Sequence, residues 1–174
     1  MDQFDIKSAP LEIERRFLIE MPDINALRQM PDYRVKHIEQ TYLLKTDDFI
    51  GGRIRKITEN GSSIYIYTYK ERISDMTRRE FEREISLEEY SRLLDCKIPD
   101  TITIIKDRHI FTYANLTYEL DVDAFWKDKA SLEAEVDSEE VDIPIPPCVK
   151  LIKEVTADRR YNNSRLAVNR GIIQ

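Results

Sequence analysis

The sequence LEIERRFLI, at residues 11–19, decides the fold. Successive side chains of a β-strand point to opposite faces of the sheet. With this period, one face of the stretch is mostly apolar, and the other presents two carboxylates and a guanidinium, from Glu12, Glu14 and Arg16. An ordinary half-exposed strand turns such charges to water. The same charged alternation returns along most of the chain, however, and therefore needs a common explanation.

Turn and cap signals divide the rest of the chain into short strands and a few helices. Asn60-Gly61 is typical of a type I′ hairpin turn, and a second hairpin is expected near Ala114-Asn115. Ser86 and Glu89 fit a capping box that opens a helix. Eight candidate strands joined mostly as neighbours predict an antiparallel sheet.

Two architectures satisfy this periodicity. In an open sheet, one face packs on helices and the charged face lies in water; periodicity alone favours this simpler arrangement. In a closed barrel, the apolar face points outward under two or three helices, and the charged residues line a central lumen.

Composition limits the classes of function. A single domain over residues 1–174, with a core from about 11 to 168, is expected from the length of 174 residues. The net charge of −6 argues against non-specific nucleic-acid binding. No apolar run is long enough to cross a membrane, and the two cysteines lie far apart. We therefore expect a cytoplasmic protein with reduced thiols, either a monomer or a homodimer.

The alternating positions carry eight acidic and seven basic side chains, so their charges nearly cancel. Hard carboxylate ligands suit Mg²⁺ or Mn²⁺, and arginine and lysine side chains suit phosphate oxygens. A shared lumen would therefore combine the two halves of a metal–polyphosphate site. The acidic candidates are Glu12, Glu14, Glu80, Glu82, Glu119, Asp121, Glu135 and Asp137, and the basic ones are Arg16, Arg53, Arg55, Lys70, Lys106, Arg108 and Arg160.

The ordered series of motifs resembles the CYTH superfamily, also called triphosphate tunnel metalloenzymes. Residues 12–16, EIERR, resemble its ExExK signature, and residues 154–167, EVTADRRYNNSRLA, resemble its terminal motif. Between them lie segments similar to the family's QGYL, RxR, EFEYE, KxR, ExD and AEVE motifs, at residues 40–43, 53–55, 80–84, 106–108, 119–121 and 134–137.

This resemblance implies a mainly β protein of the α+β class, an eight-stranded antiparallel closed barrel with a charged lumen and flanking helices. It implies that Arg53, Arg55, Lys70, Lys106, Arg108 and Arg160 grip a triphosphate. It implies a Mg²⁺ or Mn²⁺ site formed by Glu12, Glu14, Glu119, Asp121, Glu135 and Asp137, while Glu80 and Glu82 orient the arginines.

The chain departs from the family signature at Arg16, where the signature has lysine. The resemblance implies catalytic roles for Arg16 and Glu14, but arginine stays protonated and is a poor base. The expected function is divalent-metal-dependent hydrolysis of inorganic triphosphate or an organic triphosphate. Two alternatives use the same lumen: a class IV-type adenylate cyclase, and a non-catalytic module that binds polyphosphate or nucleotides.

Overall fold

The computed structural model describes residues 6–47 and 49–173. Their strands form one antiparallel sheet. Its strands are β1 (Leu11–Glu20), β2 (Arg34–Leu43), β3 (Gly52–Glu59), β4 (Ser62–Arg72), β5 (Thr77–Ile85), β6 (Ile104–Tyr113), β7 (Leu116–Asp123), β8 (Lys129–Val136) and β9 (Leu151–Glu154). The described helices are α1 (Ile24–Leu27), α2 (Leu87–Leu94) and α3 (Asn163–Asn169), with two 3-10 helices, η1 (Ile6–Ser8) and η2 (Arg159–Tyr161).

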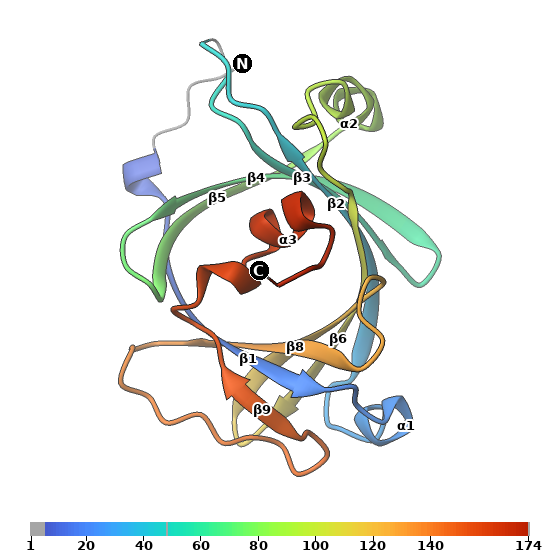
Figure 1. Ribbon diagram of the computed structural model, residues 1–174, viewed down its shortest axis with the longest axis vertical. Coiled ribbons are helices and arrows are strands. Elements are labelled where there is room, and N and C mark those ends of the chain that lie inside the picture. Colours follow the sequence, from blue (N-terminus) through green and yellow to red (C-terminus); the bar gives the residue numbers. More distant parts are fainter. Residues whose placement is uncertain (1–5, 48, 174) are drawn as a thin grey trace.

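The sheet closes on itself. The strand order is β5-β4-β3-β2-β6-β7-β8-β1-β9, and β5 also pairs with β1. Strands β1 to β8 therefore form a closed antiparallel barrel, seen as a ring in Figure 1. The predicted barrel is confirmed, and the open-sheet alternative is wrong. The predicted domain limits of 1 and 174 lie outside the described residues.

Strand β1 closes the barrel. Along one edge it pairs with β8 from Ile13 to Glu20. Along the other edge it pairs first with β5, through residues 11–13, and then with β9, through residues 17–19. Between these partners, the backbone N–H of Arg16 donates to Oγ1 of Thr156 at 3.0 Å. The stretch with the clearest alternation thus joins both ends of the sheet.

The apolar outer face is covered by two different kinds of segment. Helix α2 packs Tyr90 and Leu93 against Ile54 and Tyr67 of β3 and β4. On the far side, Phe17 and Leu132 pack beneath α1 and the proline-rich segment 138–150. That segment has no regular structure, as its prolines predict. The outer cover is therefore helical on one side and partly irregular on the other.

The predicted local signals are confirmed. Asn60 and Gly61 have φ angles of 50° and 80°, and Ala114 and Asn115 have 48° and 65°, as the two hairpin turns require. The side chain of Ser86 accepts a hydrogen bond from the backbone N–H of Glu89, at the start of α2. None of the described helices is both long and apolar enough to span a membrane.

Helix α3 lies across one end of the barrel (Figure 1) rather than outside it with α1 and α2. Its Leu166 and Ala167 form a buried apolar cluster with Leu18 and Ile104. Leu18 and Ile104 continue the faces of β1 and β6 that carry Arg16 and Lys106. The inner face therefore changes from charged to apolar where α3 covers the barrel.

Candidate functional site

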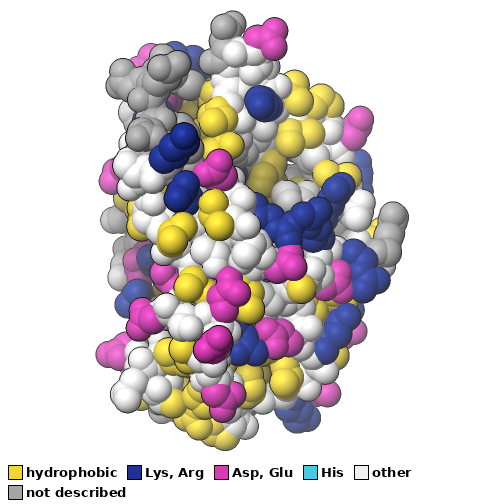
Figure 2. Space-filling view, turned by 90° about the vertical axis from the view of Figure 1, so that its left-hand side faces the viewer, with side chains coloured by type: hydrophobic (Ala, Val, Ile, Leu, Met, Phe, Trp, Pro, Cys, Tyr) yellow, Lys and Arg dark blue, Asp and Glu magenta, His cyan; other side chains and the backbone are white. Residues whose placement is uncertain are grey.

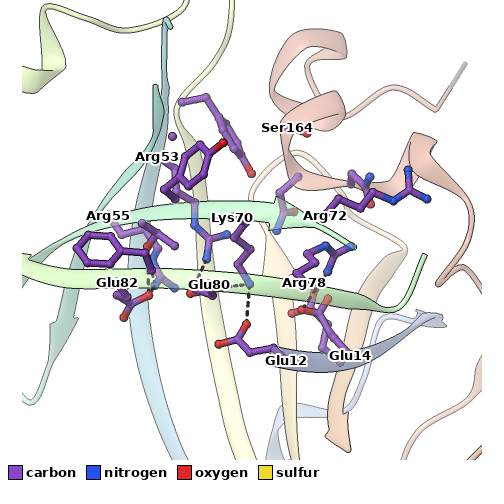
Figure 3. Close-up of a pocket in the computed structure, with 18 of the residues that line it drawn as sticks. Glu12, Glu14, Arg53, Arg55, Lys70, Arg72, Arg78, Glu80, Glu82 and Ser164 are labelled. Atoms are coloured by element: carbon purple, nitrogen blue, oxygen red, sulfur yellow. Dashed lines mark hydrogen bonds and ion pairs between the residues drawn. The ribbon is translucent and has the colours of Figure 1, made fainter. Parts of the chain in front are cut away.

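A cavity of about 1140 Å³ occupies the barrel and opens to solvent. Charged residues of all eight barrel strands, β1 to β8, line it. Figure 3 shows those of β1, β3, β4 and β5. On the face shown in Figure 2, lysine and arginine side chains gather beside a hollow. The charged alternation therefore faces one shared interior.

Arg53 and Arg55 of β3 and Lys70 of β4 form the basic wall. The Lys70 ammonium lies 3.2 Å from Oε2 of Glu12, and the guanidinium of Arg55 forms an ion pair with Glu82. The Nη2 atom of Arg53 is 3.8 Å from Oε1 of Glu80. The Nε atoms of Arg53 and Arg55 are buried and have no hydrogen-bond partner among the described residues. An anionic ligand would satisfy such donors.

Burial and neighbouring charges shift the pKa values of two residues of the basic wall, Lys70 and Arg55. Burial and the positive charge of Arg53 lower the pKa of Lys70, although Glu14 and Glu12 oppose the shift. Burial and Arg53 also lower the pKa of Arg55, against the effect of Glu82. Both groups would gain from a nearby negative charge, because it favours their charged form.

Glu12, Glu14, Glu119, Glu133 and Glu135 form the acidic wall, on β1, β7 and β8. Glu14 is the direct strand partner of Glu135, and Glu119 is the partner of Glu133. Like charges directly opposite one another destabilise a sheet. Partial burial and the negative charges of Glu12 and Glu119 raise the pKa of Glu135. A cation bound at this wall would reduce the repulsion.

Arg16 forms ion pairs with two carboxylates of the acidic wall. Its Nη2 lies 2.8 Å from Oε1 of Glu14, and its Nε lies 2.6 Å from Oε1 of Glu133. Its Nη1 donates to the carbonyl oxygen of Tyr161, in η2, at 3.1 Å. Burial alone would lower the pKa of Arg16, but Glu133 and Glu14 raise it well above its usual value. The side chain is therefore a fixed cation.

Glu14 is held in its ionised form. Burial alone would raise its pKa, but Arg16, Lys70 and Arg78 together lower the pKa to about 2. The Nη1 atom of Arg78 lies 3.5 Å from Oε2 of Glu14. A permanently ionised carboxylate facing a cavity is a suitable ligand for a hard cation.

The donor set fits an ion that shares its coordination with phosphate. Among the described residues, no three acidic, histidine or cysteine side chains form a ready-made ligand group. Mg²⁺ rarely needs such a group, because it keeps several waters and binds one or two carboxylates together with substrate phosphates. Glu12, Glu14 and Glu135 provide carboxylates in the lining of the same cavity as the basic wall.

Most of the predicted site residues line the cavity, but four do not. Lys106 and Asp121 are 2% and 1% exposed and form a buried ion pair. The same carboxylate accepts bonds of 2.7 and 2.8 Å from the Nε and Nη2 atoms of Arg108. This placement suits a residue that orients Arg108, and the predicted metal role of Asp121 stays a prediction.

The other two lie at the ends of their motifs. Asp137 follows β8 and is exposed outside the cavity lining. Arg160 forms an ion pair of 2.7 Å with Asp158 on the surface, while Arg159 lines the cavity instead. Their predicted roles in metal and phosphate binding stay predictions.

The predicted site left out four charged cavity residues on strands: Lys36, Arg72, Arg78 and Glu133. Glu133 shares the face of Glu135, and Arg78 shares the face of Glu80. Arg72 shares the face of Lys70. The two-residue period places Glu133 on the face of Glu135, and extended by one step it also places Arg72 and Arg78 on the cavity face.

The geometry agrees with what the chain resembles in sequence. Residues 10–143 match the model of the CYTH domain. The chain belongs to the CYTH family. Members of this family bind triphosphate-containing substrates and generally depend on divalent ions. The predicted resemblance is thus confirmed.

Solved structures are similar to this CYTH chain over most of its length. The crystal structure of the inorganic triphosphatase NE1496 is 27% identical, covers 90% of this chain and 94% of its own, and has a TM-score of 0.56. The PH1819 protein from Pyrococcus horikoshii OT3 is 22% identical, covers 74% and 80%, and has a TM-score of 0.57, which shows a shared fold. No curated protein matches the chain.

Proposed function

We propose that this CYTH protein is a divalent-metal-dependent triphosphatase, which hydrolyses inorganic triphosphate or an organic triphosphate. The observation that carries the proposal is that acidic and basic residues line one shared cavity inside the barrel. The likeness to the inorganic triphosphatase NE1496, at 27% identity, supports the choice of reaction. Phosphoryl transfer depends mainly on positioning and charge neutralisation, which such walls provide.

The basic wall binds the phosphate chain. Arg53 and Arg55 present buried Nε donors that have no hydrogen-bond partner in the described part of the chain, and Lys70 adds an ammonium on the next strand. These groups donate hydrogen bonds to phosphate oxygens. Glu80 and Glu82 lie beside Arg53 and Arg55 and orient the two guanidinium groups.

The acidic wall holds the ion. Glu12, Glu14 and Glu135 would bind Mg²⁺ or Mn²⁺, with Glu119 nearby on β7. When bound, the ion neutralises phosphate charge and polarises a phosphoryl oxygen. Arg16 stays protonated and is held by two carboxylates, so it positions Glu14 and does not accept a proton.

Phosphate release from inorganic triphosphate, with Mg²⁺ and Mn²⁺ in separate arms, tests the proposal. We expect release that chelation of the metal abolishes. Product analysis with ATP separates this reaction from cyclisation, because a cyclase yields cyclic nucleotide and pyrophosphate. Tight triphosphate binding without any turnover would instead identify a non-catalytic module and overturn the proposal.

A further inference from the structure

Along three neighbouring strands, β4, β3 and β2, the inner face of the barrel changes from polar to apolar. On β3, Arg55 is followed by Ile57, which shares its face because side chains two residues apart point the same way. Ile38 of β2 is the direct strand partner of Ile57, and Ile66 of β4 is the direct partner of Arg55. Three isoleucines therefore adjoin the basic wall on the inside of the barrel.

Ile38, Ile57 and Ile66 form an apolar cluster of their own, here called the isoleucine cluster. Ile38 and Ile57 line the same cavity as the charged walls. All three are less than 10% exposed and pack on one another, so their surface is formed before any ligand binds. Ile57 lies about 7 Å along β3 from Arg55, whose Nε has no hydrogen-bond partner among the described residues.

An apolar surface beside phosphate-binding donors suits a ligand with two parts. An inorganic phosphate chain has no apolar surface with which to cover isoleucine side chains. An organic triphosphate joins an anionic chain to a carbon-rich group, and burial of that group against the isoleucines is favourable. The cavity of about 1140 Å³ also has room for both parts, because pockets for drug-sized ligands typically measure roughly 300–1,000 Å³.

We propose that the isoleucine cluster is the subsite for the apolar ring of an organic triphosphate, whose phosphate chain lies along Arg53 and Arg55. The proposal narrows the substrate to organic triphosphates with a compact, largely apolar ring, and it rests on the proposed function of the cavity. A strongly polar group in the same place would lose hydrogen bonds to water without replacement. The cluster therefore selects among triphosphates by the group that they carry.

Phenyl triphosphate and methyl triphosphate test this selection in the unmodified protein, with Mg²⁺ at one fixed ionic strength. The two esters carry the same charge, so the ratio of their kcat/KM values reports the apolar group alone. We expect phenyl triphosphate to be favoured at least about tenfold, and inorganic triphosphate to be no better than the methyl ester. Equal values for the two esters, or a preference for inorganic triphosphate over both, would overturn the subsite.

Substitutions locate the effect. Ile57→Thr places a hydroxyl group in the cluster and should lower the phenyl-to-methyl ratio about tenfold, and Ile57→Val, shorter by one methylene, should lower it less. The matched control is Ile105→Thr, because Ile105 is 44% exposed on the outer face of β6. A ratio that both Ile57 variants leave unchanged, or that Ile105→Thr lowers equally, would contradict the assignment.

The failure of the proposed function has a different signature. If none of the three triphosphates is hydrolysed, the protein is not a triphosphatase for these compounds. The ratio of the dissociation constants of the two esters, measured by calorimetry with Mg²⁺ and the same variants, still decides the subsite. A ratio near one in the unmodified protein would then refute it.

Discussion

The acidic and basic walls belong to the same closed sheet, but different kinds of contact neutralise their charges. On the acidic wall, Arg16 contacts Glu14 and Glu133, and Arg108 contacts Glu119 and Asp121, so fixed cations hold the carboxylates in place. On the basic wall, the Nε atoms of Arg53 and Arg55 have no hydrogen-bond or ion-pair partner among the described residues, whereas Nε of Arg16, which also lacks a hydrogen bond, lies 2.6 Å from Oε1 of Glu133. The difference indicates that the acidic wall is pre-organised, whereas the basic wall depends on its ligand.

The comparison also assigns an orientation to the proposed substrate. In the proposed function, phosphate oxygens would face β3 and β4, and the ion would lie between them and β1 and β8. A variant on the acidic wall should therefore affect metal-dependent chemistry, and a variant on the basic wall should affect phosphate binding.

The largest effect is expected for Glu14→Gln, which keeps the size of the side chain and removes its charge. We expect kcat for triphosphate to fall at least about 100-fold, because ion binding loses an ionised ligand. Steady-state phosphate release measures the change. Glu39→Gln is the control. Glu39 lies outside the cavity lining, where its Oε1 is 2.9 Å from Nζ of Lys56, and we expect its substitution to leave kcat unchanged. A similar loss in both variants would refute the special role of Glu14.

Arg53→Gln should weaken binding more than it slows the chemistry. A hydrogen bond to a charged group contributes about 1.5–3 kcal/mol, so kcat/KM should fall about 10- to 100-fold, mainly through KM. The matched control is Lys56→Gln, on the opposite face of β3. A loss confined to kcat would contradict the assignment of Arg53 to phosphate binding.

Arg16→Lys tests how firmly the acidic wall is fixed. Lysine has no planar fork that could contact two carboxylates and the carbonyl of Tyr161 together. We expect the free energy of unfolding to fall by about 2 kcal/mol, measured by urea denaturation. The control is Arg15→Lys, whose side chain pairs with Glu154 on the outer surface and should cost less. Equal losses of unfolding free energy in the two variants would show that the contacts of Arg16 stabilise the protein no more than those of an arginine on the outer surface.

The smallest effects are expected from ligands added singly. Mg²⁺ alone should raise the melting temperature slightly by relieving the repulsion between Glu14 and Glu135. Triphosphate alone should raise it through the basic wall, and the Mg²⁺ effect should disappear in Glu14→Gln. Thermal denaturation at several ligand concentrations separates the two responses. A shift with Mg²⁺ that persists in Glu14→Gln would place the ion elsewhere.

Much of the fold and the cavity lining could be predicted because the strand period is two. Once Glu12, Glu14 and Arg16 are assigned to one face, the closure of the barrel determines where that face points. The same rule would have included Glu133, which the family motif alone did not suggest. Residues inside strands were therefore the most predictable.

Two other features of the site could not be predicted from the two-residue period: the placement of segments outside the strands, and the burial of individual side chains by their partners. Arg159 and Arg160 lie in a 3-10 helix, where no two-residue period decides which side chain faces the cavity. Helix α3 is amphipathic enough to fit either the outer face or the barrel end, and only its contacts with Leu18 and Ile104 distinguish them. Asp121 shares its face with Glu119 but is buried by its bonds to Lys106 and Arg108.

The central claim is that one cavity holds phosphate on the basic wall and a divalent ion on the acidic wall. A crystal structure with Mn²⁺ and a triphosphate analogue that resists hydrolysis tests it most directly, because manganese gives an anomalous signal. We predict an anomalous peak beside Glu14 and Glu135, with phosphate oxygens bound by Arg53 and Arg55. A peak outside the barrel, or an analogue bound away from β3 and β4, would contradict the account.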